Sequence, residues 1–174
     1  MTALSSGTIT LRAPRARDRE RVGEIVRAAG VFRPDEIAVA LEVFDGAVQS
    51  PGVDYHAIGA FEEDRLLGFA CFGPTPCTLA TWDLYWIAID PDAHRRGIGR
   101  LLMTASEGAI AAHGGRLVVV ETASRDDYGP TRTFYEAIGY ARAADIPEYY
   151  APGDGLIVYV KTLAPPTGES LHHG

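Results

Sequence analysis

The sequence predicts an α/β fold in a single domain, with a mixed central sheet of six or seven strands and four helices. Three observations support this prediction. The length of 174 residues is typical of one domain with a core of its own. The composition, with 47% hydrophobic and 22% charged residues, is that of an ordinary globular protein. Segments with extended and helical patterns alternate along the chain in the order β α α β β β α β α β β.

The N-terminal part of the chain predicts one strand and two helices. Residues 8–12 alternate between polar and apolar side chains, which indicates a short strand. Residues 18–29 repeat apolar side chains at helical spacing, and Gly30 ends this helix. A second helix begins after Pro34, places Phe44 and other apolar residues on one face, and stops before Pro51.

The middle of the chain predicts three strands and a long helix. Residues 55–62 and 66–72 are strand-like segments, and the short polar connection between them indicates a hairpin. Residues 79–89 form a longer strand that Pro91 stops. A helix over residues 97–113 follows and ends at Gly114. Its predicted buried face consists of Ile98, Leu101, Leu102, Ala105 and Ala109.

The last part of the chain predicts three more strands and a short helix. Residues 117–122 are almost continuously aliphatic, which is typical of a strand buried on both faces. A short helix covers residues 131–138. Two strands, 140–146 and 156–162, are joined by a turn-rich loop at 147–155. The domain is therefore expected to span residues 1–163, and residues 164–174 are expected to form a flexible tail.

Charge and composition exclude several classes of function. The formal charge is −7, so a basic surface for nucleic acid is not expected. Lys161 is the sole lysine, which argues against phosphate-loop and Schiff-base chemistry. Cys71 and Cys77 are expected to be free thiols, and the histidines have no zinc-ligand spacing. No membrane span or secretion signal is recognised, so a cytoplasmic location without bound metal is expected.

The segment that carries chemistry is residues 84–100, L-Y-W-I-A-I-D-P-D-A-H-R-R-G-I-G-R. A strand enters a tight turn, and Gly97 and Gly99 open a helix whose free N–H groups and dipole suit an anion. Arg95, Arg96 and Arg100 add positive charge. A plain strand-to-helix turn that uses glycine for tightness is the alternative interpretation. A dinucleotide fingerprint is excluded, because Leu102 occupies the position of its third glycine.

Two motifs in this chain resemble those of the GNAT family of N-acetyltransferases. The sequence H-R-R-G-I-G at residues 94–99 is similar to the family signature [Q/R]-x-x-G-x-[G/A], with His94 in place of the usual Gln or Arg. The sequence F-Y-E-A-I-G-Y at residues 134–140 resembles the helix end that follows in the family. The resemblance covers residues 8–163 and includes the order of strands and helices.

The resemblance implies that acetyl-CoA binds where the sheet splays, between the strand at 79–89 and the strand at 117–122. Its pantetheine arm would pair with the backbone of Ile87, Ala88 and Ile89. Its pyrophosphate would lie on the turn and helix start formed by His94, Arg95, Arg96, Gly97, Ile98, Gly99 and Arg100. Tyr128 occupies the position where the family often has an asparagine that touches the pantetheine. Arg125 and Arg132 are either phosphate contacts or solvated surface arginines.

The resemblance also assigns catalytic roles. Tyr135 matches the general acid that protonates the departing CoA thiolate, and a core tyrosine is the alternative. Three candidates remain for the base that deprotonates the amine: Asp83, whose spacing is similar to that of a glutamate base in one branch of the family, Glu121, and a water relayed by the backbone. Phe32, Trp82, Tyr85, Tyr149 and Tyr150 are candidate pocket walls, and Arg33 is a candidate anchor for a substrate carboxylate.

The implied function is direct transfer of an acetyl group from acetyl-CoA to a primary amine of a small molecule, for example an amino acid. One alternative is acetylation of a protein N-terminus or lysine, which needs an open groove. A second alternative, from a different class, is an acyl-CoA-binding module without catalysis. Dimers are common in the family, so a homodimer is expected by analogy.

Overall fold

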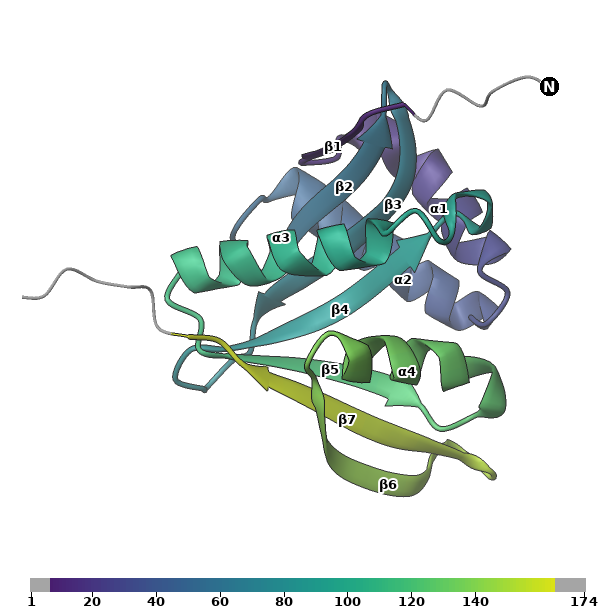
Figure 1. Cartoon of the computed structure of the whole chain (residues 1–174), viewed down its shortest axis with the longest axis vertical. Coiled ribbons are helices and arrows are strands. Elements are labelled where there is room, and N and C mark those ends of the chain that lie inside the picture. The colour runs from purple at the N-terminus through teal and green to yellow at the C-terminus, as the bar shows by residue number, and fades with distance from the viewer. Residues whose placement is uncertain (1–6, 165–174) are drawn as a thin grey trace, which may run out of the picture.

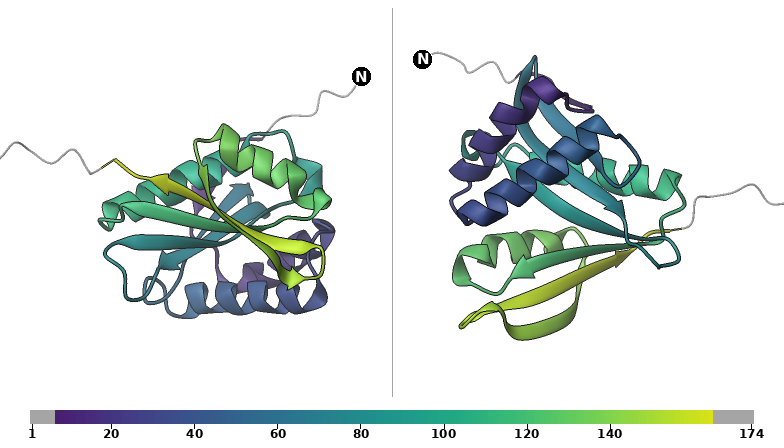
Figure 2. Two further views of the ribbon diagram at one scale, coloured as in Figure 1. Left: turned by 90° about the horizontal axis from the view of Figure 1, so that it is seen from below. Right: turned by 180° about the vertical axis from the view of Figure 1, so that it is seen from behind.

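The computed structural model describes residues 7–164, which form one mixed sheet of seven strands with two helices packed on each face (Figures 1 and 2). The predicted fold class is therefore confirmed. Of the expected tail, residues 165–174 lie outside the described residues. Within residues 7–164, no helix combines the length and the apolar character that crossing a membrane would need. The strands, in their order across the sheet, are β1 (Ile9–Arg12), β2 (His56–Glu62), β3 (Arg65–Pro74), β4 (Thr81–Ile89), β5 (Leu117–Ala123), β7 (Asp154–Thr162) and β6 (Ala141–Ala151).

Helices α1 (Arg19–Ala28) and α2 (Pro34–Gln49) cover one face of the sheet. Figure 2 shows them side by side when the molecule is seen from behind. The apolar stripe of α1 packs on aromatic residues of β2 and β3, among them Phe61 and Phe69. Proline at its first position and a capping box start α2, in which the Arg33 amide donates to Glu36 Oε2 at 2.7 Å. The cap holds the Glu36 side chain at the first turn of α2.

Helices α3 (Ile98–Ala112) and α4 (Gly129–Ala137) cover the opposite face (Figure 1). The predicted buried face of α3 is partly wrong. Leu101 is 41% exposed, whereas Met103, Ser106 and Ile110 are buried. The helix is turned so that Ile98, Leu102 and Met103 meet the sheet, and the alanine-rich edge of the predicted stripe is only half-buried.

The predicted loop at 147–155 is largely strand. β6 continues to Ala151, and the hairpin turns at residues 152–153, where Gly153 has a φ of 80°. Ile146 pairs with Leu156 and Ala151 with Asp154, so residues 147–150 face Gly155 alone. A Cβ at residue 155 would lie 2.8 Å from the Ile146 carbonyl oxygen, so the bulge requires glycine there. Proline and glycine indicate a loop in the sequence, yet an edge strand accepts both.

β4 and β5 separate partway along their length, which confirms the splayed sheet. Their parallel pairing runs only from Thr81 to Leu84 on β4. On its other side β4 stays paired with β3, but Cys71 pairs with Trp86 and Phe72 with Leu84, so Tyr85 is an inserted bulge residue. A bulge bends its strand. The bend begins where pairing with β5 ends, and the two strands diverge from there (Figure 1).

Candidate active site

A cavity of about 220 Å³ lies where β4 and β5 separate. Each strand contributes the residues just beyond the last pair, and the connection between α1 and α2, the start of α4 and the β6–β7 hairpin close the remaining sides. The lining residues are Val31, Phe32, Glu36, Leu84, Tyr85, Trp86, Ile87, Val120, Glu121, Thr122, Ala123, Tyr128, Thr131, Tyr135, Tyr150 and Asp154. The cavity therefore joins the helix start of α4 on one face of the sheet to α2 on the other.

The bulge in β4 directs two aromatic side chains to the α1–α2 face. The Tyr85 ring meets Tyr55 at 5.2 Å between centroids, and the Trp86 ring meets Phe32 at 4.8 Å. Regular alternation would have placed neighbouring side chains on opposite faces. Phe32, Tyr85 and Tyr150 line the cavity, as predicted for pocket walls. Of the other two predicted walls, Trp82 is buried in the α3–α4 core and Tyr149 is 56% exposed.

Tyr135 lies on the α4 side of the cavity and is only 2% exposed. Its ring packs against Phe134, Tyr140 and Tyr159. Within residues 7–164 its hydroxyl makes no hydrogen bond. Burial, with a smaller contribution from Tyr128, raises the pKa of Tyr135, so the hydroxyl stays protonated at neutral pH. The structure thus presents a proton donor at the cavity wall.

The two candidate carboxylate bases differ in position. Glu121 lines the cavity, whereas Asp83 does not. Asp83 Oδ2 instead accepts a hydrogen bond of 2.7 Å from Thr75 Oγ1. Burial, followed by the negative charge of Asp83, raises the pKa of Glu121. Glu121 is therefore a carboxylate whose pKa is moved toward neutrality and whose side chain faces the cavity.

The turn before α3 holds a row of free backbone donors. Arg95 and Gly97 have positive φ values of 64° and 74°, and α3 begins at Ile98. Leu101 is the first amide to donate inside the helix, to the Gly97 carbonyl oxygen at 3.1 Å. Among residues 7–164, no acceptor is bonded to the N–H groups of residues 95–100. Consecutive free amides at a helix start form a site suited to phosphate oxygens.

The side chains of this turn are used unevenly. Arg96 Nη2 donates to Glu62 Oε1 at 2.6 Å, so its charge is balanced by a carboxylate. The His94 ring lies 3.3 Å from the Ile89 carbonyl oxygen through Nε2. Arg95 and Arg100 are exposed and take part in no ion pair within the described residues. Of the three arginines expected to add positive charge to this turn, Arg95 and Arg100 do so freely, whereas the charge of Arg96 is balanced by Glu62.

Glycine at residue 99 has a packing reason. A Cβ there would lie 3.3 Å from two ring atoms of Phe134 on α4. That distance is tighter than ordinary van der Waals contact, so glycine lets the start of α3 approach α4 closely.

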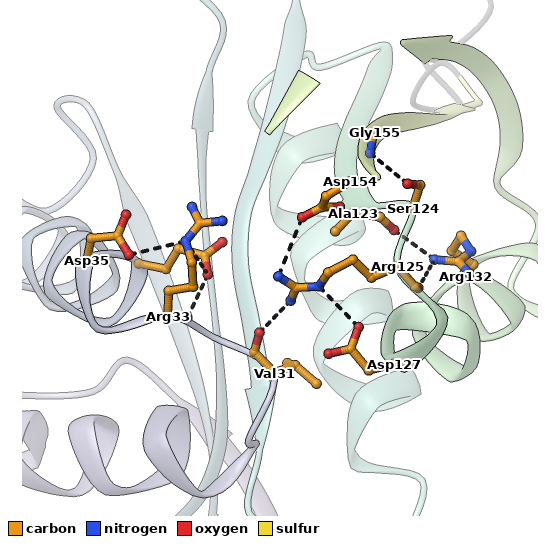
Figure 3. A network of polar contacts seen from close by, with 11 residues as sticks. Val31, Arg33, Asp35, Ala123, Ser124, Arg125, Asp127, Arg132, Asp154 and Gly155 are labelled. Atoms are coloured by element: carbon orange, nitrogen blue, oxygen red, sulfur yellow. Dashed lines mark hydrogen bonds and ion pairs between the residues drawn. The ribbon is translucent and has the colours of Figure 1, made fainter. Parts of the chain in front are cut away.

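Arg125 lies beside the cavity and is bound to protein acceptors rather than free in solvent (Figure 3). Its Nη2 donates to the Val31 carbonyl oxygen at 2.8 Å, its Nε to Asp127 Oδ1 at 3.2 Å, and its Nη1 to Asp154 Oδ2 at 3.5 Å. The guanidinium also lies 5.3 Å from the centre of the Tyr128 ring. Neither predicted role, phosphate contact or free surface arginine, describes this side chain.

Arg132 and Arg33 are also committed to protein acceptors. Arg132 Nη1 donates to the carbonyl oxygens of Ala123 and Arg125, at 2.7 and 2.9 Å, and holds the end of β5 (Figure 3). Arg33 Nε donates to Asp35 Oδ1 at 3.3 Å and does not line the cavity. The structure therefore does not favour Arg33 as an anchor for a substrate carboxylate.

Sequence reasoning missed two carboxylates that line the cavity, Glu36 and Asp154. Asp154 is 5% exposed, and its Oδ1 is buried without a hydrogen-bond partner among the described residues. Burial, and then the charges of Glu121, Tyr149, Asp154 and Glu36, raise the pKa of Tyr150 to about 12. In the sequence, Glu36 stands in the first turn of the helix predicted after Pro34, a position that indicates a helix start and not a cavity. Asp154 lay in a segment that looked like a loop.

No cluster of three or more metal-ligating side chains that could hold a metal ion occurs within residues 7–164.

A family model described as "Acetyltransferase (GNAT) domain" matches residues 54–142. A GNAT-family protein from Desulfovibrio desulfuricans has a solved structure that is 36% identical, with a TM-score of 0.86; the match covers 90% of this chain and 100% of that one.

Two further solved structures share the fold at lower identity. The ribosomal-protein-S18-alanine N-acetyltransferase from Escherichia coli is 21% identical with a TM-score of 0.73, over 95% of this chain and 99% of that one. An aminoglycoside 6'-N-acetyltransferase complexed with coenzyme A is 18% identical with a TM-score of 0.72, over 91% and 99%. One of these proteins is named for a protein substrate and the other for a small molecule.

Proposed function

The chain belongs to the GNAT acetyltransferase family, and from this premise we propose that it transfers the acetyl group of acetyl-CoA directly to a primary amine of a small molecule. Members of the family are acetyl-CoA-dependent N-acetyltransferases. The choice of a small acceptor depends on one observation: the β6–β7 hairpin and α2 close the acceptor side of the cavity with Tyr150, Asp154 and Glu36.

The residues present fit acetyl-CoA. The free N–H groups of residues 95–100 are suited to its pyrophosphate. The edge of β4 that faces β5 has no strand partner beyond Leu84, so the backbone of Ile87, Ala88 and Ile89 is available to the amides of the pantetheine arm. Tyr128 lines the same cavity. Bound acetyl-CoA supplies the thioester and the acetyl group at this place.

Tyr135 and Glu121 supply the two proton transfers in this proposal. Glu121 accepts the proton of the attacking amine, and Tyr135 gives a proton to the departing sulfur, as the C–N bond forms and the C–S bond breaks. The raised pKa of Glu121 supports its role as base, because a base works best when its pKa lies near the working pH. Asp83 acts through Glu121 by its charge, and so is a positioning residue.

A protein acceptor is the less favoured alternative. An extended peptide needs an open groove, and the hairpin residues Tyr150 and Asp154 stand on the side from which it would enter. The cavity volume of about 220 Å³ lies below the usual range of about 300–1,000 Å³ for ligand pockets. Both features favour a compact acceptor.

The test is a screen for CoA release in the presence of acetyl-CoA, with small amines, peptides with free α-amines, and peptides with internal lysines in separate arms. Calorimetry measures acetyl-CoA binding in parallel. CoA release with small amines alone supports the proposal. Release with peptides alone would show a protein acetyltransferase, and binding without release in any arm would show a non-catalytic module.

A further inference from the structure

All the charged side chains that line the cavity are acidic. Three of its lining residues are carboxylates, Glu36, Glu121 and Asp154, and none of its lining residues is a lysine, arginine or histidine. All three line the same cavity as Tyr150, and each raises the pKa of that phenol. Carboxylates that face each other across a small cavity repel unless a cation lies between them.

Asp154 retains an unused acceptor. Its side chain is 7% exposed, and its Oδ1 is buried without a partner in the described part of the chain. Its Oδ2 has a long contact of 3.5 Å with Arg125 Nη1. A buried carboxylate oxygen without a partner is costly, so such an atom beside a cavity indicates a missing donor.

Two neighbouring arginines pair with carboxylates of the cavity but do not enter it: Arg125 with Asp154 at 3.5 Å and Arg33 with Glu36. Arg125 also bonds the Val31 carbonyl oxygen and Asp127. Arg33 pairs with Asp35 and lies 3.8 Å from Glu36, with its side chain 43% exposed. Neither guanidinium lines the cavity. An anionic group on the acceptor would therefore meet carboxylates first.

Glu121 and Asp154 attach to the sheet at different points. Val158 on β7 pairs with Glu121, and Asp154 lies four residues away along the same strand. Four residues of strand correspond to about 13 Å between backbone positions. The proposed base, Glu121, and Asp154 are thus carried by separate positions along the sheet, and a linear diamine is long enough to reach from one carboxylate towards the other.

We propose that the acceptor carries a second cationic group besides the amine that is acetylated, and that Asp154 and Glu36 bind it. This inference rests on the proposed function and narrows its substrate class to diamines and polyamines. It disfavours simple amino acids, whose carboxylate would be repelled.

The test compares matched acceptors in the CoA-release assay with the full chain. Cadaverine, pentylamine and aminovalerate offer the same aliphatic reach with a cationic, neutral or anionic far end, and spermidine offers a longer polycation. We expect kcat/KM for cadaverine or spermidine to exceed that for pentylamine by about tenfold or more, the effect of one charge-assisted contact. Aminovalerate should be the poorest acceptor.

Variants assign the effect to the named residues. Asp154→Asn and Glu36→Gln keep the shape and one acceptor oxygen but remove the charge, and each should raise KM for the better dication about tenfold with little change in kcat. The same variants should raise KM for pentylamine much less than KM for the dication, because pentylamine has no second cation to lose a contact. Asp35→Asn is the matched control, because it removes a charge beside Glu36 whose side chain does not line the cavity.

The outcomes separate this inference from the proposed function. Equal use of pentylamine and both dications, or a preference for aminovalerate, overturns the second cation site while acetyl transfer stands. An equal loss for pentylamine and the dications in Asp154→Asn would mean that Asp154 only positions Arg125. Absence of CoA release with every amine would instead contradict the proposed function itself.

Discussion

The guanidinium of Arg125 donates a hydrogen bond of 2.8 Å from Nη2 to the carbonyl oxygen of Val31, 94 residues earlier in the chain. Val31 belongs to the connection between α1 and α2, and Arg125 follows β5, so the bond joins the two sides of the splayed sheet. The same guanidinium faces Asp154 on β7 (Figure 3). Three segments that close the acceptor side of the cavity are therefore tied to one side chain.

Arg125→Ala is expected to lower the free energy of unfolding by about 1–3 kcal/mol, because it leaves the buried Asp154 without its cation. Thermal and denaturant unfolding measure the loss. Asp154→Asn in the Arg125→Ala background should recover part of it, whereas additive losses would show that the two residues are not coupled. Arg142→Ala is the control: it breaks an exposed ion pair with Asp145 and should cost less than about 1 kcal/mol.

Gly97→Ala is expected to destabilise the chain by about 1 kcal/mol, because residue 97 has a φ of 74° and alanine is strained in that region. Gly108→Ala is the matched control. Both glycines have no atom within 4 Å of an added Cβ, but Gly108 lies inside α3 with ordinary helical backbone. Alanine at 108 should therefore stabilise by about 0.5–1 kcal/mol. Equal shifts in melting temperature for both variants would refute the assignment of strain to residue 97.

Tyr135→Phe should lower kcat by about 100-fold and leave the Kd for acetyl-CoA unchanged, because only the proton donor is removed. Steady-state kinetics and calorimetry give the two values. Tyr159→Phe is the control, since the Tyr159 hydroxyl bonds Glu136 at 2.8 Å and does not line the cavity. It should lower stability with kcat unchanged. Unchanged turnover in Tyr135→Phe would remove the general-acid role.

The pH dependence of kcat at saturating amine should identify the base. A base acts when deprotonated, so kcat rises with pH through the pKa of Glu121, which burial and Asp83 raise above its usual value of about 4.3. Glu121→Gln should abolish this rise and lower kcat. Asp83→Asn should shift the rise to lower pH with its plateau retained, because it removes the negative neighbour. If Asp83→Asn instead abolishes the rise, Asp83 is the base.

The same shift has a consequence for stability. The raised pKa of Glu121 means that its charged form is disfavoured in the folded state. The resulting loss in the free energy of unfolding begins as the pH rises above the unfolded pKa of about 4.3, and it is fully present above the folded pKa. Glu121→Gln should therefore raise the melting temperature at pH 8 more than at pH 4. A gain that is equal at both pH values would contradict the shift.

The sequence predicted the seven strands and four α-helices of the described residues, because their apolar periods are local and strong. It did not predict the three short 3-10 helices at 16–18, 91–93 and 126–128. Two predictions were wrong, each for a physical reason: the buried face of α3 and the loop at residues 147–155. Leu101 is exposed and Met103 is buried in its stead. Because α3 has apolar residues on more than one side, its packing against the sheet determines which of them are buried. Pro147 and Gly155 indicated a loop, but an edge strand with a bulge accommodates both.

By itself, the sequence determined the order of elements, the glycine-opened helix at 97 and the family resemblance, because each depends on neighbours in the chain. The tertiary structure alone decided which charges share the cavity. Glu36, Asp154 and Glu121 line one cavity, whereas Asp83 does not line it and accepts a hydrogen bond from Thr75. Three arginines that the sequence offered for anion binding are instead hydrogen-bonded to protein acceptors: Arg96, Arg125 and Arg132. Ion pairs and cavity walls bring together residues that are far apart in sequence, and local sequence patterns do not determine which of these residues come into contact.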